Sequence, residues 1–364
     1  MEDKLEKLHE IDPLLAKLVD GNDLTTKEAE KLVYHIFVYD TEGMHYATWV
    51  GAMHAKGENP DEIEGFLNAT KKLAVKFNAS DFNINKTTDL SGTGGGKFKS
   101  FNVSTTASFV VAAAGYTVAK EAYYAVTSPT GSADVFTTFG IDFLKLRKEQ
   151  VEETLKKVGI CPIMAQFISP KLANRSKLSR KFFVERQVRV RSPFHLAANI
   201  YSPLPMKHRI YGCYSERYLE ILANLFKKLG FRRTLTFYAD IGLPEISNVG
   251  KTTIVEQSGN HIKKYTVRPV ELGVKEAKEN DIKTGGREQN ITDFIRVLQG
   301  KEKGAKADLV AINAGAALYA LGDVKTIKEG TKKAQQILAD GAGYKKLERL
   351  ISRIGSSKLL AGWH

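Results

Sequence analysis

A glycine-rich segment at residues 91–97, SGTGGGK, constrains the fold of this chain more than any other part of it. A short strand-like segment ending at Asp89-Leu90 precedes it, and FNVSTT at 101–106 follows it. Glycines let the backbone turn its N–H groups toward an anion. Hydroxyl side chains at the start of a helix sit where unpaired N–H groups and the helix dipole favour phosphate. The segment therefore predicts a phosphate-binding turn between a strand and a helix.

A glycine-rich turn alone is equally typical of a tight turn that binds nothing. Here Lys120, just after the next expected strand, adds a positive charge that could reach the same site. No Gly-Lys-Ser/Thr closes the turn, so it is not a Walker A loop. The glycine spacing also differs from G-x-G-x-x-G, which argues against a dinucleotide-binding fingerprint.

From about residue 87 the chain alternates between strand-like and helix-like segments. We expect a helix over 104–114, strands over 116–119 and 234–238, and a strand over 308–312 leading to a helix over 315–321. This alternation predicts an α/β fold with helices covering a sheet.

The pattern of apolar and capping residues over 3–77 predicts helices and no strands. Apolar residues recur at helical spacing between Leu5 and Leu18. After a break at 21–23, Thr25 or Thr26 is expected to cap a helix with Glu28 or Glu30 near its N3 position. Another helix is expected to begin at Pro60 and continue through residue 74. These segments form a small all-helical lobe.

The length of 364 residues favours two lobes over a single core. No apolar run approaches the roughly 20 residues that cross a bilayer, and the charged start is unlike an export signal, so we expect a cytoplasmic protein. Cys161 and Cys213 lie in apolar surroundings and are expected to be small buried side chains.

The net charge of +13 favours phosphorylated ligands or nucleic acid as partners. Eight basic residues and one acid, Glu185, lie between Lys171 and Arg191, which we call the basic cluster. The cluster is interleaved with Phe182 and Phe183, so it is a possible nucleic-acid surface, and equally a solvated face with no partner.

Several separated motifs resemble the anthranilate phosphoribosyltransferase family. DLSGTGG at 89–95 with NVST at 102–105 is similar to the family's D-x-x-G-T-G-G-D…F-N-I-S-T, and TSPTGSADV at 127–135 is similar to its S-S-K-S-G-S-A-D-V. Segments 14–21 and 56–58 match its helical lobe, and 308–322 and the chain from 330 onward match its C-terminal helices. The resemblance covers nearly the whole chain.

The resemblance implies an all-helical domain over 1–77, with a contribution from about 170–188, and an α/β domain over 78–364 with a central, mostly parallel sheet. It also implies a homodimer. Family enzymes bind phosphoribosyl pyrophosphate (PRPP) with magnesium, and the amine of anthranilate displaces pyrophosphate at the anomeric carbon. Donors already aimed at the leaving pyrophosphate lower the barrier, and positioning of the amine supplies the rest.

The resemblance also implies roles for individual residues. The PRPP contacts would be Gly92, Thr93, Gly94, Gly95, Asn102, Ser104, Thr105, Lys120 and Ser132. The magnesium positions would be Ser104 and Glu245, the latter in GLPEI at 242–246, similar to the family's G-L-D-E-I. Gly96 and Pro244 stand where the family has two acids. Because magnesium takes oxygen ligands and retains waters, both weak metal binding and its loss stay open.

The acceptor side departs further from the family. Its K-H-G-N-R is KEAYY at 120–124, which puts Glu121, Tyr123 and Tyr124 beside the acceptor, and an unpaired Glu121 would repel a carboxylated molecule. Arg186 falls where the family carries a carboxylate-binding arginine, and His195 replaces the last residue of R-T-I-F-N. The two tyrosines could instead pack a hinge, and a structural role for His195 is favoured over general base catalysis.

Three functions follow. The first is transfer of phosphoribose to a small aromatic acceptor other than, or besides, anthranilate. The second is nucleic-acid binding through the basic cluster on the same fold. The third, ranked last, is a nucleoside-phosphorylase-like reaction, which uses inorganic phosphate without magnesium.

Overall fold

The computed structural model describes residues 2–124, 130–164, 169–188, 190 and 193–363. The chain divides into two compact units, one of residues 1–76 and 165–203 and one of residues 77–164 and 204–364. No helix within the described residues is long and apolar enough to cross a membrane.

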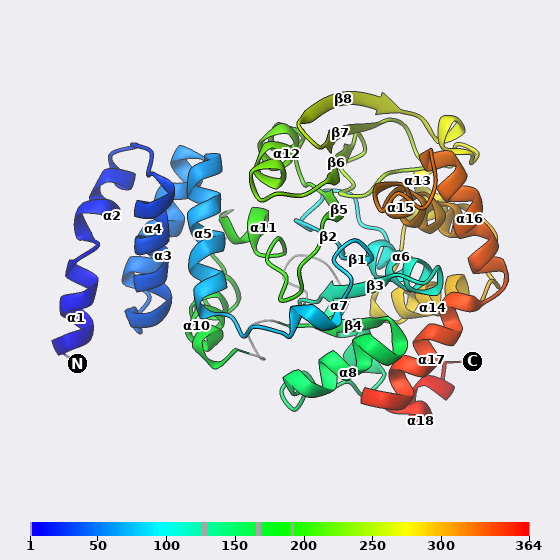
Figure 1. The fold of residues 1–364 in the computed structure, drawn as a ribbon, viewed down its shortest axis with the longest axis horizontal. Coiled ribbons are helices and arrows are strands. Elements are labelled where there is room, and N and C mark those ends of the chain that lie inside the picture. The colour runs from blue at the N-terminus through cyan, green and yellow to red at the C-terminus, as the bar shows by residue number, and fades with distance from the viewer. Residues whose placement is uncertain (1, 125–129, 165–168, 189, 191–192, 364) are drawn as a thin grey trace. The chain divides into compact units, whose positions relative to one another are not determined.

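The first unit is all-helical and carries the elements at the blue end of the colour scale in Figure 1. Its helices are α1 (Glu2–His9), α2 (Asp12–Val19), α3 (Thr26–Tyr39), α4 (Met44–Lys56), α5 (Pro60–Leu73), η2 (Pro170–Leu172), α10 (Ala173–Ser179), η3 (Arg180–Glu185) and α11 (Pro193–Ala197). Thr25 caps α3 in a reciprocal capping box with Glu28, one of the two arrangements that the sequence predicts. Pro60 begins α5 behind its cap Asn59, also as predicted.

Aromatic side chains fill the core of this helical unit. Phe37 lies edge-on to Trp49 and Phe66, with ring centroids 6.2 and 6.0 Å apart. Helices α3 and α5 approach so closely that a Cβ atom on Gly65 would lie 2.5 Å from the Cβ of Ala29. Only glycine at position 65 permits this packing.

The second unit is an α/β domain with two sheets. The first sheet has the order β1 (Thr87–Thr88), β3 (Thr117–Glu121), β4 (Ile160–Ile163), and both of its pairings are parallel. The second sheet has the order β2 (Leu90–Gly92), β5 (His208–Gly212), β6 (Arg233–Ala239), β7 (Thr252–Ser258), β8 (His261–Val267). Its first two pairings are parallel and its last two antiparallel, with β8 at the edge of the sheet (Figure 1). The predicted fold class is confirmed.

Helices cover these sheets. They are α6 (Val103–Ala113), α7 (Ser132–Thr138), α8 (Lys148–Val158), α12 (Leu219–Lys228), α13 (Glu279–Ile282), α14 (Arg287–Leu298), α15 (Ala305–Ala320), α16 (Ile327–Ala339), α17 (Ala342–Ile354) and α18 (Ser357–Ala361). Short 3₁₀ turns are η1 (Ala79–Asp81), η4 (Glu216–Tyr218) and η5 (Pro269–Leu272). Helix α6 packs on strands of both sheets and on α14, α15 and α17, so both sheets position its start.

The strand predicted over 308–312 was wrong, because those residues lie inside α15. Leu309, Val310, Ala311 and Ile312 are all fully buried. A helix enclosed on every side shows no amphipathic period, so its apolar run cannot be told from a buried strand by sequence pattern. The close packing of α15 on α16 depends on Gly315, where a Cβ atom would lie 2.3 Å from the Thr331 nitrogen.

Candidate active site

The glycine-rich turn leaves the carboxyl end of β2. Gly92 lies so close to β5 that a Cβ atom would be 2.4 Å from the Gly212 carbonyl oxygen. Gly94 and Gly95 have φ angles of 60° and 69°, in the left-handed region that favours glycine. These three glycines fix the path of the turn at the end of parallel strands, where α/β proteins commonly bind ligands.

Thr93 holds the turn to β5 and to the segment after it. Its N–H donates to the Gly212 carbonyl over 2.8 Å, and its Oγ1 accepts from the Tyr214 N–H over 2.8 Å. The same hydroxyl donates to the Gly94 carbonyl over 3.0 Å. The Thr93 side chain therefore orders the backbone, and its hydroxyl is already occupied by these bonds.

Helix α6 begins with unpaired donors. Its N-cap residue, Asn102, does not cap the helix with its side chain; the amide instead donates to Asn290 Oδ1 over 2.8 Å. The first helical bond runs from the Thr106 N–H to the Asn102 carbonyl, which leaves the N–H groups of Ser104 and Thr105 without an acceptor inside the helix. A helix terminus of this kind presents N–H donors that an anion can accept.

Thr105 adds a buried hydroxyl at the same place. The residue is 1% exposed, and its Oγ1 has no hydrogen-bond partner among the described residues. The neighbouring Thr106 Oγ1 donates to the Asn102 carbonyl, four residues back, as helical threonines commonly do. A buried polar atom without a partner is costly, so Thr105 is the group here that most needs a ligand oxygen.

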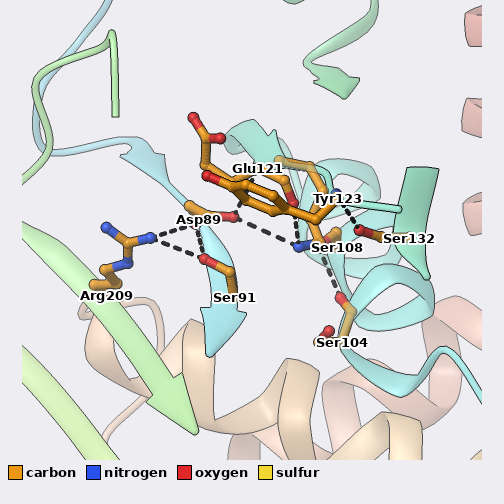
Figure 2. A network of polar contacts seen from close by, with 9 residues as sticks. Asp89, Ser91, Ser104, Ser108, Glu121, Tyr123, Ser132 and Arg209 are labelled. Atoms are coloured by element: carbon orange, nitrogen blue, oxygen red, sulfur yellow. Dashed lines mark hydrogen bonds and ion pairs between the residues drawn. The ribbon is translucent and has the colours of Figure 1, made fainter. Parts of the chain in front are cut away.

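Behind the turn lies a buried charged network, shown in Figure 2. The Arg209 guanidinium donates to Asp89 over 2.5 Å and to Ser91 Oγ over 2.8 Å, while Ser91 also contacts Asp89. Asp89 and Arg209 are both fully buried. A buried pair of this kind gives little net stability, but removal of one partner leaves an uncompensated charge. The network ties β2 to β5 beneath the glycine turn.

Lys120, near the end of β3, joins this network. Its Nζ lies 3.9 Å from Asp89 Oδ1 and donates to the Glu121 carbonyl over 2.9 Å. The side chain is almost fully buried, and burial lowers the pKa of Lys120 below its ordinary value, although Asp89 and Glu121 act to raise it. The buried amine of Lys120 thus lies near Asp89, just before the strand β2 that leads into the glycine turn.

Glu245 lies partly buried among positive charges. Burial raises the pKa of Glu245 to about 7, while Lys99 and Lys120 act to lower it. Lys99 Nζ donates to the Gly96 carbonyl over 2.8 Å. Gly96 itself packs on Pro244, since a Cβ atom at position 96 would lie 2.4 Å from the Pro244 Cδ. The two residues that replace family acids are thus in direct contact.

Residues after β3 are linked to α7. The Tyr123 N–H donates to Ser132 Oγ over 3.1 Å, and the Tyr123 carbonyl accepts from Ala133 over 3.0 Å. Tyr124 is 44% exposed and lies edge-on to Phe143, with ring centroids 6.4 Å apart. Residues 127–129 of the second family motif lie outside the described residues.

Glu121 is 1% exposed, and its carboxylate points away from Ser104 and Ser108 (Figure 2). The predicted acceptor residues divide between the two units: Tyr123 and Tyr124 belong to the α/β unit, and Arg186 and His195 to the helical unit. Arg186 is exposed at the end of η3. The His195 ring lies edge-on to Phe183, with ring centroids 5.1 Å apart.

The basic cluster is less open than its sequence indicates. Arg175 is buried, and the ring of Phe182 packs on Tyr46 and on Phe183. Lys171, Lys177 and Arg180 are exposed. Positions 189 and 191 lie outside the described residues. The two half-buried aromatic rings thus contribute to the packing of the helical unit.

Within the described part of the chain, no three His, Cys, Asp or Glu side chains are grouped so that they could hold a metal ion. Cys161 and Cys213 are fully buried, which raises their pKa far above the ordinary thiol value. Both are small core side chains, as expected.

A helical bundle and an α/β unit are the two domains of one glycosyl transferase family. Residues 12–74 match the model of the glycosyl transferase family's helical bundle domain, and residues 85–344 match that of its a/b domain. The chain is 33% identical to the anthranilate phosphoribosyltransferase of Methanococcoides burtonii, over 95% of this chain and 94% of that protein. It is 34% identical to that of Methanosarcina acetivorans, over 90% and 85%.

Solved structures agree. The crystal structure of anthranilate phosphoribosyltransferase from Thermus thermophilus matches with a TM-score of 0.83 and 30% identity, over 93% of this chain and 98% of that one. The Saccharomyces cerevisiae enzyme in complex with PRPP and Mg matches with a TM-score of 0.81, over 95% and 98%, but its 20% identity shows the fold alone. The chain belongs to this glycosyl transferase family, whose members here are PRPP-dependent phosphoribosyltransferases. The family predicted from the sequence is confirmed.

Three residues at the site escaped the sequence reasoning. Arg209 lies within the mostly buried strand HRIYG, and an arginine in a buried strand is itself a signal of a buried ion pair. Lys99 was not distinguished from Lys97, because only the tertiary structure shows that Lys99 turns back to Gly96. Asn290 comes from α14, far away in the sequence, and nothing local predicts its bond to Asn102.

Proposed function

We propose that the chain is a phosphoribosyltransferase that binds PRPP in its α/β unit and transfers the phosphoribosyl group to an aromatic amine or related acceptor. One observation carries the proposal: among the described residues, the start of α6 presents N–H groups without an acceptor inside the helix and a buried Thr105 hydroxyl without a partner, and the glycine turn shaped by Gly94 and Gly95 precedes it. The relatives at 33–34% identity are phosphoribosyltransferases, which supports the same conclusion.

In the proposed reaction the C–O bond between the anomeric carbon and the pyrophosphate breaks. A C–N bond to the acceptor amine forms, the amine loses a proton, and pyrophosphate leaves with its electron pair. The N–H groups of Ser104 and Thr105 would bind the leaving pyrophosphate, with the Thr105 hydroxyl and Lys120 adding donors. The backbone N–H groups are fixed by the start of α6, so they need little reorganisation when negative charge develops.

The remaining predicted PRPP contacts take supporting roles in this proposal. Gly92 and Thr93 set the turn, and Asn102 is positioned by Asn290. Ser132 Oγ accepts from the backbone of Tyr123 and so joins the start of α7 to the strand end. The pyrophosphate would therefore lie between the turn and α6, and Ser132 would border the ribose side.

We propose an acceptor that carries no carboxylate. The family's histidine, glycine, asparagine and arginine after Lys120 are here Glu121, Ala122, Tyr123 and Tyr124. The arginine that could attract a carboxylate at this point is absent from that segment, and the half-exposed Tyr124 offers a ring face. Arg186 and His195 stay predictions as acceptor contacts.

The residues present do not fit a magnesium ion held by the protein's own carboxylates. Gly96 and Pro244 fill their positions with a direct contact, and Glu245 is accompanied by two ammonium groups, Lys99 and Lys120. Magnesium requires several oxygen ligands around it. A role for Ser104 and Glu245 as magnesium ligands stays a prediction, and no step above depends on it.

The test is a pair of measurements on the whole chain. Thermal unfolding with PRPP at a hundredfold excess over its dissociation constant should show about 2.7 kcal/mol of stabilisation. Release of pyrophosphate should then be followed with aniline-type amines, heteroaromatic amines and anthranilate, with the uncarboxylated amines turning over faster. Absence of stabilisation by PRPP, with or without magnesium, would rule the proposal out.

Other predicted partners have weaker support. Phe182 and Phe183 are half-buried and pack on Tyr46 and on each other, which weakens the stacking argument for nucleic acid. No contact in the described residues favours the phosphorylase-like reaction, and the predicted homodimer also stays a prediction. Sedimentation of the purified chain would settle the oligomeric state.

A further inference from the structure

Gly96 and Pro244, the two residues that stand where the family has acids, are in direct contact. A Cβ atom at Gly96 would lie 2.4 Å from the Pro244 Cδ and 2.6 Å from the Gly242 carbonyl oxygen. Any side chain at position 96 would therefore collide with the pyrrolidine ring and with backbone. The glycine turn and the 242–246 segment are therefore in direct contact at Gly96 and Pro244, the two positions that lack the family's acids.

A lysine side chain, that of Lys99, reaches back to Gly96. Lys99 is partly buried and its Nζ donates to the Gly96 carbonyl over 2.8 Å, so the chain turns back on the glycine turn. Lys99 and Lys120 are the two cations whose charges act on Glu245. Lys120 also lies 3.9 Å from Asp89, so Lys99 is the ammonium group at the turn that this buried acid does not already pair.

A lysine ammonium group and a divalent metal ion can both stabilise the negative charge of a pyrophosphate group. Both supply positive charge and bind phosphate oxygens, lysine through N–H donors and the metal through direct coordination. The ammonium differs in being part of the chain, so its effect does not depend on the metal concentration.

We propose that this site binds the pyrophosphate group of PRPP without a protein-held magnesium ion, and that Lys99 provides the positive charge in its place. The inference rests on the proposed function, because it concerns the same pyrophosphate. It assigns Lys99 as a binding residue and makes the Gly96–Pro244 contact the reason that the metal position is lost.

The decisive experiment is calorimetric titration of the whole chain with PRPP, once with saturating magnesium and once with excess EDTA. The dissociation constant should differ by less than about threefold, well under 1 kcal/mol. PRPP binding that requires magnesium would overturn this inference and leave the proposed function standing. No PRPP binding in either condition would overturn both.

Substitutions then separate charge from structure. Lys99→Gln keeps a donor for the Gly96 carbonyl but removes the charge, and should weaken PRPP binding in EDTA about tenfold, the worth of one charge-assisted hydrogen bond. Lys99→Arg should retain most of the affinity. The matched control is Lys97→Gln, an exposed lysine of the same loop, which should change binding little. Equal losses for Lys97→Gln and Lys99→Gln would show a diffuse charge effect and contradict the assignment.

A reverse substitution makes the inference testable even if Lys99→Gln does not fold. Pro244→Asp together with Lys99→Gln restores the acidic pair 244–245 and removes the ammonium. In this variant PRPP binding should become magnesium-dependent, with affinity at least about tenfold higher with the metal than in EDTA. Metal-insensitive binding by the double variant would count against the proposal that Lys99 replaces the ion.

Discussion

At the scale of single residues, Thr105 and Thr106 are adjacent threonines in opposite situations. Both are buried in the first turn of α6, yet Thr106 Oγ1 is bonded to the Asn102 carbonyl, whereas Thr105 Oγ1 has no partner among the described residues. An unsatisfied buried hydroxyl destabilises the folded chain unless a ligand supplies a partner. The two positions therefore offer a matched pair.

Thr105→Val should raise the free energy of unfolding of the ligand-free chain by about 1 kcal/mol, because it removes the unpaired hydroxyl without changing shape. The same substitution should weaken PRPP binding about tenfold, since a donor to the pyrophosphate is lost. Chemical denaturation and calorimetric titration measure the two quantities.

Thr106→Val is the control, and it should lower stability slightly and leave PRPP binding unchanged. If Thr105→Val lowered stability and left binding unchanged, Thr105 would be a structural residue and the proposed pyrophosphate site would lose its main support.

At the scale of elements, glycines decide how closely helices approach. Gly65 on α5 faces Ala29, with only 2.5 Å for a Cβ atom, and the Thr26 carbonyl oxygen lies 2.7 Å from the same point. Gly51 on α4 has nothing within 4 Å of its Cβ position. Both glycines are inside helices, so intrinsic helix propensity favours alanine at each.

Gly65→Ala should destabilise the chain by about 1–3 kcal/mol, because overpacking outweighs the gain in propensity. Gly51→Ala should stabilise it by up to about 1 kcal/mol, since only the propensity changes. Thermal unfolding followed by circular dichroism compares them. A stabilising Gly65→Ala would mean that α3 and α5 are not packed as closely as described.

Helices were predicted correctly where capping residues mark their starts, and a helix was mistaken for a strand where residues 309–312 are all buried. Two helices begin at capping signals that depend only on nearby residues. These are Thr25 with Glu28 for α3, and Asn59 with Pro60 for α5. Residues 308–312 carry no such signal and no period, because α15 is enclosed on all sides. Their helical state follows from their neighbours α6 and α16.

At the scale of the whole molecule, the net charge of +13 is the property most open to misinterpretation. Positive charge attracts nucleic acid without any dedicated site, and such binding weakens steeply with salt. In the basic cluster, Phe182 and Phe183 pack within the helical unit. We therefore expect weak oligonucleotide binding that rests on charge alone.

Fluorescence anisotropy with a single-stranded oligonucleotide should show binding that is lost between low and physiological salt. Charge reversal at exposed Lys171 and Lys177 should weaken it several-fold, and Phe183→Leu should leave it unchanged. Salt-resistant binding that is lost in Phe183→Leu would instead indicate base stacking and revive the nucleic-acid function.

The sequence by itself determined the family, the helical lobe and the glycine turn before α6, because these depend on residues close together in the chain. Only the tertiary structure decided what surrounds the two positions that lack the family's acids. There Gly96 packs on Pro244 and its carbonyl accepts from Lys99, whereas the sequence shows these residues only separately. The loss of an acid can leave a gap, a bound water or a new charge. Which of these occurs depends on contacts between segments far apart in the sequence, and these contacts cannot be predicted from local patterns.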